Sequence, residues 1–96
     1  MTPVRVDEAL WSSVTAPEGI LLAWMEPNGV VVGQGARLAE VLIEGASHEI
    51  LAPAGGLLVH DMVAPGIVDP GATIGRILEQ IPLPGGGKVS RRSLDG

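Results

Sequence analysis

Side chains that could do chemistry gather at two places in the sequence. The first group is Glu44, Ser47, His48 and Glu49, and the second is His60 with Asp61. A histidine beside carboxylates could bind a metal ion or form an acid–base pair. A serine could act as a nucleophile where an oriented base and an oxyanion pocket stand beside it.

The expected strand geometry argues against both kinds of chemistry. Successive residues of a strand point to opposite faces, so His48 and Glu49 do not converge, and neither do His60 and Asp61. Nothing around Ser47 marks an oriented base or an oxyanion pocket. We therefore predict solvated strand residues here, with no catalytic residue, no metal site and no enzymatic activity.

The composition predicts one small all-β domain. The 96 residues are enough for a single hydrophobic core and too few for two. Two Trp, no Phe and no Tyr imply an aliphatic core. Fourteen Gly and eight Pro indicate short strands joined by tight turns. A Pro- and Gly-rich run over 82–87 cannot continue a sheet, which predicts a domain over residues 1–81 and a flexible tail over 82–96.

Charge and hydropathy exclude two classes of partner. The net charge is -5 and the basic residues form no basic face, so we expect no nucleic-acid binding. No apolar run approaches the roughly 20 residues of a membrane-spanning helix. The first eight residues are too acidic and too broken for a signal peptide, which predicts a cytoplasmic protein. Because the chain has no cysteine, it contains no disulfide and no thiolate site.

The sequence on either side of residues 42–50 is similar. Residues 17–42 align with residues 53–78 at a constant offset of 36 and without a gap. The identical pairs are Pro17/Pro53, Gly19/Gly55, Leu21/Leu57, Leu22/Leu58, Val32/Val68, Gly35/Gly71, Ala36/Ala72 and Leu42/Leu78. This pattern predicts an internal repeat with a hairpin at its midpoint.

Apolar runs between turn signals predict the individual strands. They cover residues 4–6, 19–25, 30–32, 38–43, 47–51, 57–59 and 74–78. Between the first two we expect a loop over residues 7–15, whose Trp11 either closes one end of the core or stays exposed as a partner contact. Met25 and Met62 are predicted core residues. Glu44-Gly45 suits a two-residue type I′ turn, which needs positive φ at both positions.

Several of these segments together resemble the biotinyl/lipoyl attachment domain family, in particular its lipoyl branch. The matching residues run from Pro17 to Met25, then include Gly29, Val32, Gly35, the Leu38-Ala39-Glu40-Val41 run, Glu49-Ile50, Ala52-Pro53 and Gly55. The resemblance implies a flattened β-barrel, or barrel-sandwich hybrid, of two four-stranded antiparallel sheets with pseudo-two-fold symmetry. It also implies that the hairpin lies at one end and the termini at the other.

The resemblance places the attachment site of the family on the hairpin tip. Family members carry Asp-Lys-Ala there, and lipoic acid or biotin acylates the lysine. Here Glu44, Gly45 and Ala46 occupy those positions, so the resemblance implies neither lipoyl nor biotinyl attachment, and no cofactor.

An acidic tip is also common among lipoyl domains, whose partner enzymes read its charge. The expected docking surface is Glu44, Gly45, Ala46, Ser47, His48 and Glu49. The expected partners are enzymes of a 2-oxoacid dehydrogenase or carboxylase type complex.

Two other interpretations stay open at this point. The chain could be a swinging-arm carrier modified elsewhere, at Lys88, which is its only lysine, or through Ser47 or His48. It could also be an adaptor like the lysine-free lipoyl-like domains of secretion and efflux assemblies, although it lacks their signal peptide and helical hairpin.

Overall fold

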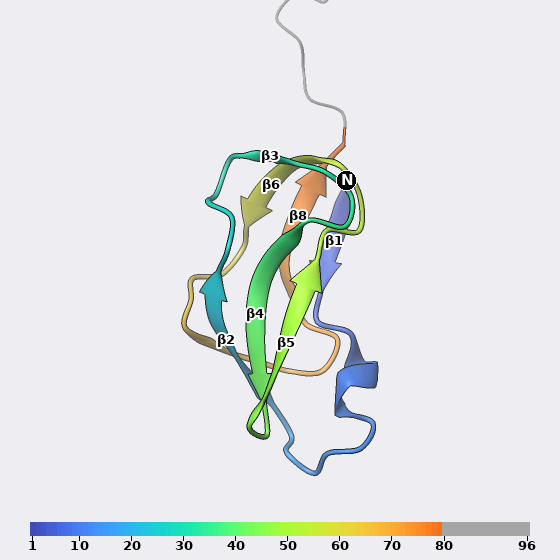
Figure 1. Ribbon diagram of the computed structural model, residues 1–96, viewed down its shortest axis with the longest axis vertical. Coiled ribbons are helices and arrows are strands. Elements are labelled where there is room, and N and C mark those ends of the chain that lie inside the picture. The colour runs from blue at the N-terminus through green and yellow to red at the C-terminus, as the bar shows by residue number, and fades with distance from the viewer. Residues whose placement is uncertain (80–96) are drawn as a thin grey trace, which may run out of the picture.

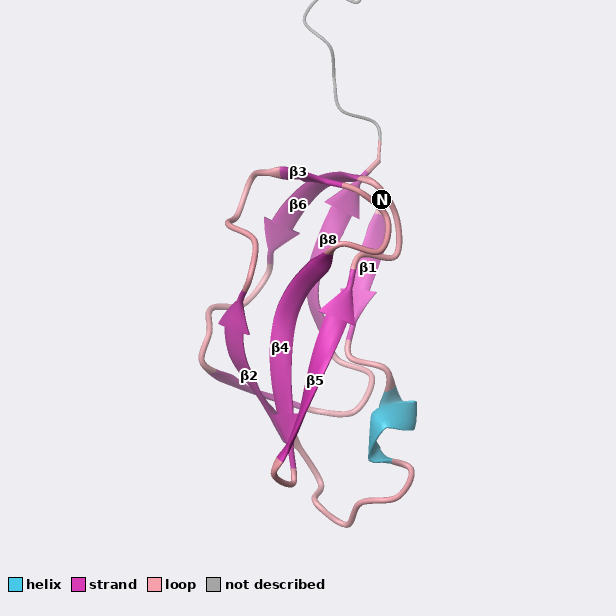
Figure 2. Ribbon diagram, in the orientation of Figure 1, coloured by secondary structure: helices cyan, strands magenta, loops and turns pink. Residues whose placement is uncertain are grey.

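The computed structural model describes residues 1–79 of the chain. The predicted domain boundary after residue 81 and the predicted tail over 82–96, with Lys88, lie outside the described residues. Eight strands and one short 3-10 helix make up the described part (Figure 2). They are β1 (Thr2–Arg5), η1 (Glu8–Trp11), β2 (Gly19–Trp24), β3 (Val31–Val32), β4 (Arg37–Ile43), β5 (Ala46–Leu51), β6 (Gly56–His60), β7 (Gly66–Val68) and β8 (Thr73–Leu78).

The strands form two four-stranded antiparallel sheets, as predicted. The first has the order β1-β8-β6-β3 and the second the order β5-β4-β2-β7. We call them the β1 sheet and the β5 sheet. In the described part no strand belongs to both sheets, so they form a sandwich and do not close into the predicted barrel. The β4–β5 hairpin lies at one end of the sandwich and the N-terminus at the other, beside the end of β8 (Figure 1).

Aliphatic side chains from both sheets fill the core, because alternate residues of each strand point inward. In β4 Ala39, Val41 and Ile43 alternate in this way, and Leu38 is also fully buried beside the bulge between Arg37 and Ala39. Trp11 is only 8% exposed, so it does close the core, and the alternative of an exposed partner contact is wrong. Met62 packs against the core as expected. Met25 is 45% exposed, which contradicts its predicted core position: it lies beyond the end of β2, where Trp24 takes the inward place.

The segment over residues 7–15 contains more structure than the predicted loop. The η1 helix begins after Asp7, whose carboxylate accepts a hydrogen bond of 2.9 Å from the Ala9 amide. A carboxylate at this position satisfies an amide that has no partner inside the helix. The helix ends at Trp11 and so brings the indole into the core.

The two sheets have corresponding registers, with one local difference. In the β5 sheet Leu21 pairs with Val41, and in the β1 sheet Leu58 pairs with Ile77. Val41 and Ile77 are related by the offset of 36, so their strand partners, Leu21 and Leu58, occupy corresponding places in the two sheets. The ungapped alignment instead matched Leu21 with Leu57, one residue earlier. A bulge between Leu21 and Ala23 absorbs the extra residue of β2. Beyond the bulge the offset of 36 holds, since Ala23 pairs with Glu40 and Val59 with Arg76.

This register makes Gly19 the counterpart of Gly56. A Cβ on Gly19 would lie 3.0 Å from the Leu42 carbonyl oxygen, and a Cβ on Gly56 would lie closer still to the carbonyl of Leu78. At Gly55, which the ungapped alignment matched with Gly19, the nearest atom would be at an ordinary 3.5 Å. Both sheets therefore use a glycine where a neighbouring strand passes too close for a side chain.

Candidate functional site

The hairpin tip has the predicted two-residue turn. Ile43 pairs with Ala46, so only Glu44 and Gly45 form the loop. Their φ angles are 47° and 83°, both positive, as a type I′ turn requires. Glycine at the second position avoids the cost of a side chain in this conformation. A Cβ at Gly45 would have no atom within 4 Å, so the tip projects into open space.

The carboxylate of Glu44 does not stand free at the tip. It accepts hydrogen bonds from the Thr15 amide at 3.0 Å and from the Thr15 hydroxyl at 3.1 Å. These two bonds tie the loop that follows η1 to the hairpin. The sequence suggested a solvated Glu44, because nothing local links residues 15 and 44.

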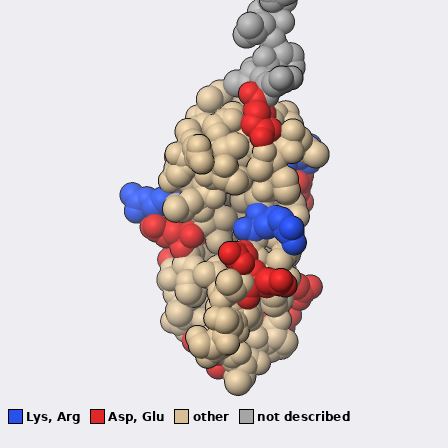
Figure 3. All heavy atoms as spheres, turned by 90° about the vertical axis from the view of Figure 1, so that its right-hand side faces the viewer, with Lys and Arg blue, Asp and Glu red and all other residues tan. Residues whose placement is uncertain are grey.

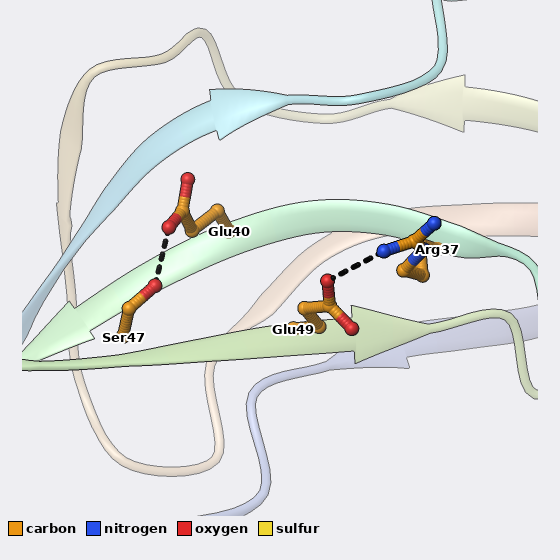
Figure 4. A network of polar contacts seen from close by, with 4 residues as sticks. All are labelled: Arg37, Glu40, Ser47 and Glu49. Carbon is orange, nitrogen blue, oxygen red and sulfur yellow. Dashed lines mark hydrogen bonds and ion pairs between the residues drawn. The ribbon is translucent and has the colours of Figure 1, made fainter.

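Two other tip residues are held by polar partners on β4 (Figure 4). The Ser47 hydroxyl donates to the Glu40 carboxylate, and Arg37 pairs with Glu49 at 3.1 Å. Ser47 thus has a carboxylate beside it and no histidine as a base. Within residues 1–79, no hydrogen bond or ion pair joins His48 to Glu44 or Glu49. The hairpin does not assemble the groups that nucleophilic catalysis requires.

The described residues do not assemble a metal site either. Over residues 1–79, no group of three or more His, Asp or Glu side chains is placed to hold a metal ion. His48 and Glu49 face opposite ways on β5, with His48 half-buried and Glu49 exposed. The predicted tip residues are therefore a polar surface in which Glu44, Ser47 and Glu49 each bond to a different residue outside the tip.

The second histidine, His60, has a structural role that the sequence did not predict. The His60 ring stacks on Trp24, with the ring centroids 3.8 Å apart and the planes 9° from parallel. Its Nε2 lies 2.9 Å from the carbonyl oxygen of Glu26, so that nitrogen carries the hydrogen and donates. Asp61 pairs with Arg76. Trp24 and His60 are related by the offset of 36, the one sequence signal that could have indicated this contact.

An open hollow of about 340 Å³ lies beside the hairpin tip. Its lining consists of Glu18, Gly19, Ile20, Leu42, Glu44, Gly45 and Ile67. Ile20 and Ile67 are cross-strand partners and are 40% and 67% exposed. We did not predict this surface, because β2 is apolar on both faces and its sequence does not show which face is outward.

Charge is unevenly distributed over the described surface. Its three arginines each have a partner: Arg5 donates to the Gly71 carbonyl, Arg37 pairs with Glu49 and Arg76 with Asp61. Figure 3 shows acidic but no basic side chains toward the hairpin end of the face in view. The hairpin end therefore has local negative charge.

No protein-family model and no curated protein matches this chain. The likeness to the biotinyl/lipoyl attachment domain family consequently stays a resemblance carried by residue spacing. In the part of the chain that the structure describes, no helix is long and apolar enough to cross a membrane.

Proposed function

We propose that this chain is a lipoyl-like domain without a modifiable lysine, which acts as a non-enzymatic protein-interaction module. The observation that carries the proposal is the tight Glu44–Gly45 turn at the end of a projecting hairpin. In the resembling family that position presents an amine, and here it presents a glycine. The proposed partners are enzymes of a 2-oxoacid dehydrogenase or carboxylase type complex in the cytoplasm.

The arrangement of the hairpin supports docking better than catalysis. Glu44 is bound by the loop after η1, and Ser47 and Glu49 are bound by residues of β4. These three side chains are therefore held in place before a partner arrives. A preformed surface loses less conformational entropy on binding. The negative hairpin end favours a partner surface with positive charge.

The intact mass of protein purified from its native host, with co-purifying proteins identified in the same preparation, tests this proposal. We expect an unmodified mass and a stable enzyme partner from a lipoyl- or biotin-dependent complex. An added lipoyl or biotinyl mass would favour the alternative carrier, modified at Ser47, His48 or Lys88, and peptide mapping would locate the group. An unmodified protein with no such partner would contradict the proposed function.

A further inference from the structure

The outer face of the β5 sheet carries three apolar side chains in a row at the hairpin end. Ile67 of β7 pairs with Ile20 of β2, and Ile20 pairs with Leu42 of β4. Ile67 is 67% exposed, Ile20 40%, and Leu42 is half-buried. We call Ile67, Ile20 and Leu42 the outer apolar row. Cross-strand neighbours lie close enough to form one continuous surface, and contiguous exposed apolar surface marks interaction sites.

Acidic residues stand beside this row. Glu18 and Glu44 line the same hollow as Ile20, Leu42 and Ile67. The two hydrogen bonds from Thr15 hold the Glu44 carboxylate in position. None of the described arginines lines the hollow. The site therefore combines an apolar floor with a negative rim.

The β1 sheet provides an internal comparison. Its corresponding row is Val31, Leu57 and Leu78, paired in the same way across β3, β6 and β8. Val31 is 66% exposed, close to the value for Ile67. Because Gly19 corresponds to Gly56, the residue that corresponds to Glu18 is Gly55, which carries no charge. The apolar row is thus common to both sheets, whereas Glu18 belongs to one.

We infer that the outer apolar row binds a short segment of a partner protein in which apolar side chains alternate with lysine or arginine. The inference rests on the proposed function for the existence of a partner, and it adds the surface and the chemistry of the contact. Apolar side chains would cover Ile67 and Ile20, and the basic side chains would meet Glu18 and Glu44. A second copy of the chain would bring these carboxylates against their own counterparts, and an anionic membrane would repel them.

A defined peptide tests the inference. The probe is a fluorescein-labelled octapeptide of alternating leucine and lysine, titrated with the full chain and followed by fluorescence anisotropy. Two comparison peptides replace leucine by serine or lysine by glutamate. We expect the leucine–lysine peptide to bind more tightly than either, with an affinity that falls as salt is added.

Matched variants locate the site. Ile67→Thr removes apolar surface from the outer apolar row and keeps a β-branched side chain, so we expect it to weaken binding about tenfold. Val31→Thr makes a similar change on the other sheet and should leave the affinity unchanged. Glu18→Gln should weaken binding and reduce its salt dependence. Ile20→Thr repeats the test at a second position, and thermal unfolding confirms that each variant is folded.

Several outcomes would overturn the inference. Equal effects of Ile67→Thr and Val31→Thr would place the contact elsewhere or make it non-specific. If the serine–lysine peptide bound equally well, the contact would depend on charge alone. If the leucine–glutamate peptide bound equally well, the contact would depend on apolar side chains alone. If the chain dimerised and Ile67→Thr abolished the dimer, the outer apolar row would bind a second copy of the chain. If the chain bound anionic vesicles and Ile67→Thr abolished that binding, the row would bind lipid.

The two proposals can fail separately. If a native enzyme partner is recovered and Ile67→Thr still binds it normally, the proposed function stands and the outer apolar row is not the binding site. If the peptide binds as expected but no lipoyl- or biotin-dependent enzyme is recovered, the outer apolar row is a binding site and the proposed class of partner is wrong.

Discussion

Trp24 and His60 stack on each other, and each ring donates a hydrogen bond to the backbone carbonyl two residues beyond the other ring. The Trp24 Nε1 donates to the Met62 carbonyl at 3.0 Å, and the His60 Nε2 donates to the Glu26 carbonyl at 2.9 Å. Trp24 ends β2 in the β5 sheet and His60 ends β6 in the β1 sheet. Glu26 and Met62 are themselves related by the offset of 36. The pair therefore joins corresponding points of the sandwich through one stack and two matching bonds.

The first prediction concerns this pair. His60→Ala should lower the free energy of unfolding by about 1–3 kcal/mol, because it removes the stacked ring and the hydrogen bond to Glu26. His48→Ala is the matched control and should change it by less than about 0.5 kcal/mol. Urea unfolding of both variants checks this. A double-mutant cycle with Trp24→Ala should give a coupling of about 0.5–1.5 kcal/mol, and additive effects would contradict a direct contact.

Adjacent glycines test the register of the sandwich. Gly56→Ala should destabilise the fold by about 3 kcal/mol or more, because its Cβ would overlap the backbone of Leu78 and its φ is 150°. Gly55→Ala should cost less than about 1 kcal/mol, since the nearest atom would be 3.5 Å from the new Cβ. Thermal unfolding of the two variants is the measurement. The reverse ranking would support the ungapped alignment over the register described above.

Local chemistry explains what the sequence could predict. The Glu44–Gly45 turn follows from residue types that accept positive φ, and the two strands of the hairpin follow from the apolar runs on either side of it. The two-sheet fold follows from many short apolar runs between Gly- and Pro-rich turns. Each of these features depends on residues that are close in sequence, and the structure bears each of them out.

Contacts between distant residues explain what the sequence could not predict. The bulge at Leu22 is hidden because β2 is apolar throughout, so a shift by one residue changes no polar pattern. The bonds from Thr15 to Glu44 join segments 29 residues apart. The predicted core position of Met25 was wrong because the alternating pattern of a strand does not show which way an apolar residue at its end points. Of the candidate site, the position and shape of the hairpin were predictable, and the bonds of its side chains were not.

The bonds between Thr15 and Glu44 lead to a local prediction. Glu44→Asn keeps a residue that tolerates the left-handed turn but shortens the side chain, so the Thr15 amide loses its acceptor. We expect that amide to exchange with solvent about tenfold faster, while the free energy of unfolding changes by less than about 1 kcal/mol. Hydrogen exchange followed by NMR checks this. Glu49→Gln is the control, and equal acceleration in that variant would point to general loosening of the hairpin.

The bonds to Glu79 lead to a prediction about the stability of the fold at acid pH. The hydrogen bond from the Thr2 hydroxyl, followed by that from the N-terminal amine, lowers the pKa of Glu79 below its ordinary value of 4.5. A carboxyl with a lowered folded pKa stabilises the fold fully above its ordinary pKa, and the contribution is lost as the pH falls through the lowered pKa. Glu79→Gln should therefore reduce stability at neutral pH and flatten its decline below pH 4.5. Unfolding curves measured across that range, with Glu26→Gln as control, would show this. An unchanged pH profile would be evidence against the contact.

A lysine restored at the tip tests the resemblance itself. Gly45→Lys should fold with a loss of about 1 kcal/mol, because φ at this position is 83° and the added side chain meets no neighbour. If the hairpin keeps the presentation of a carrier domain, a lipoyl ligase with lipoate and ATP should acylate this variant, and intact mass would show the product. Ala46→Lys places an amine one residue along the same exposed tip and should stay unmodified. The native chain, with Lys88 alone, should also stay unmodified. Acylation of Ala46→Lys as readily as Gly45→Lys would mean that the ligase reads an accessible amine on the tip, and the alignment of Gly45 with the attachment position would lose its support.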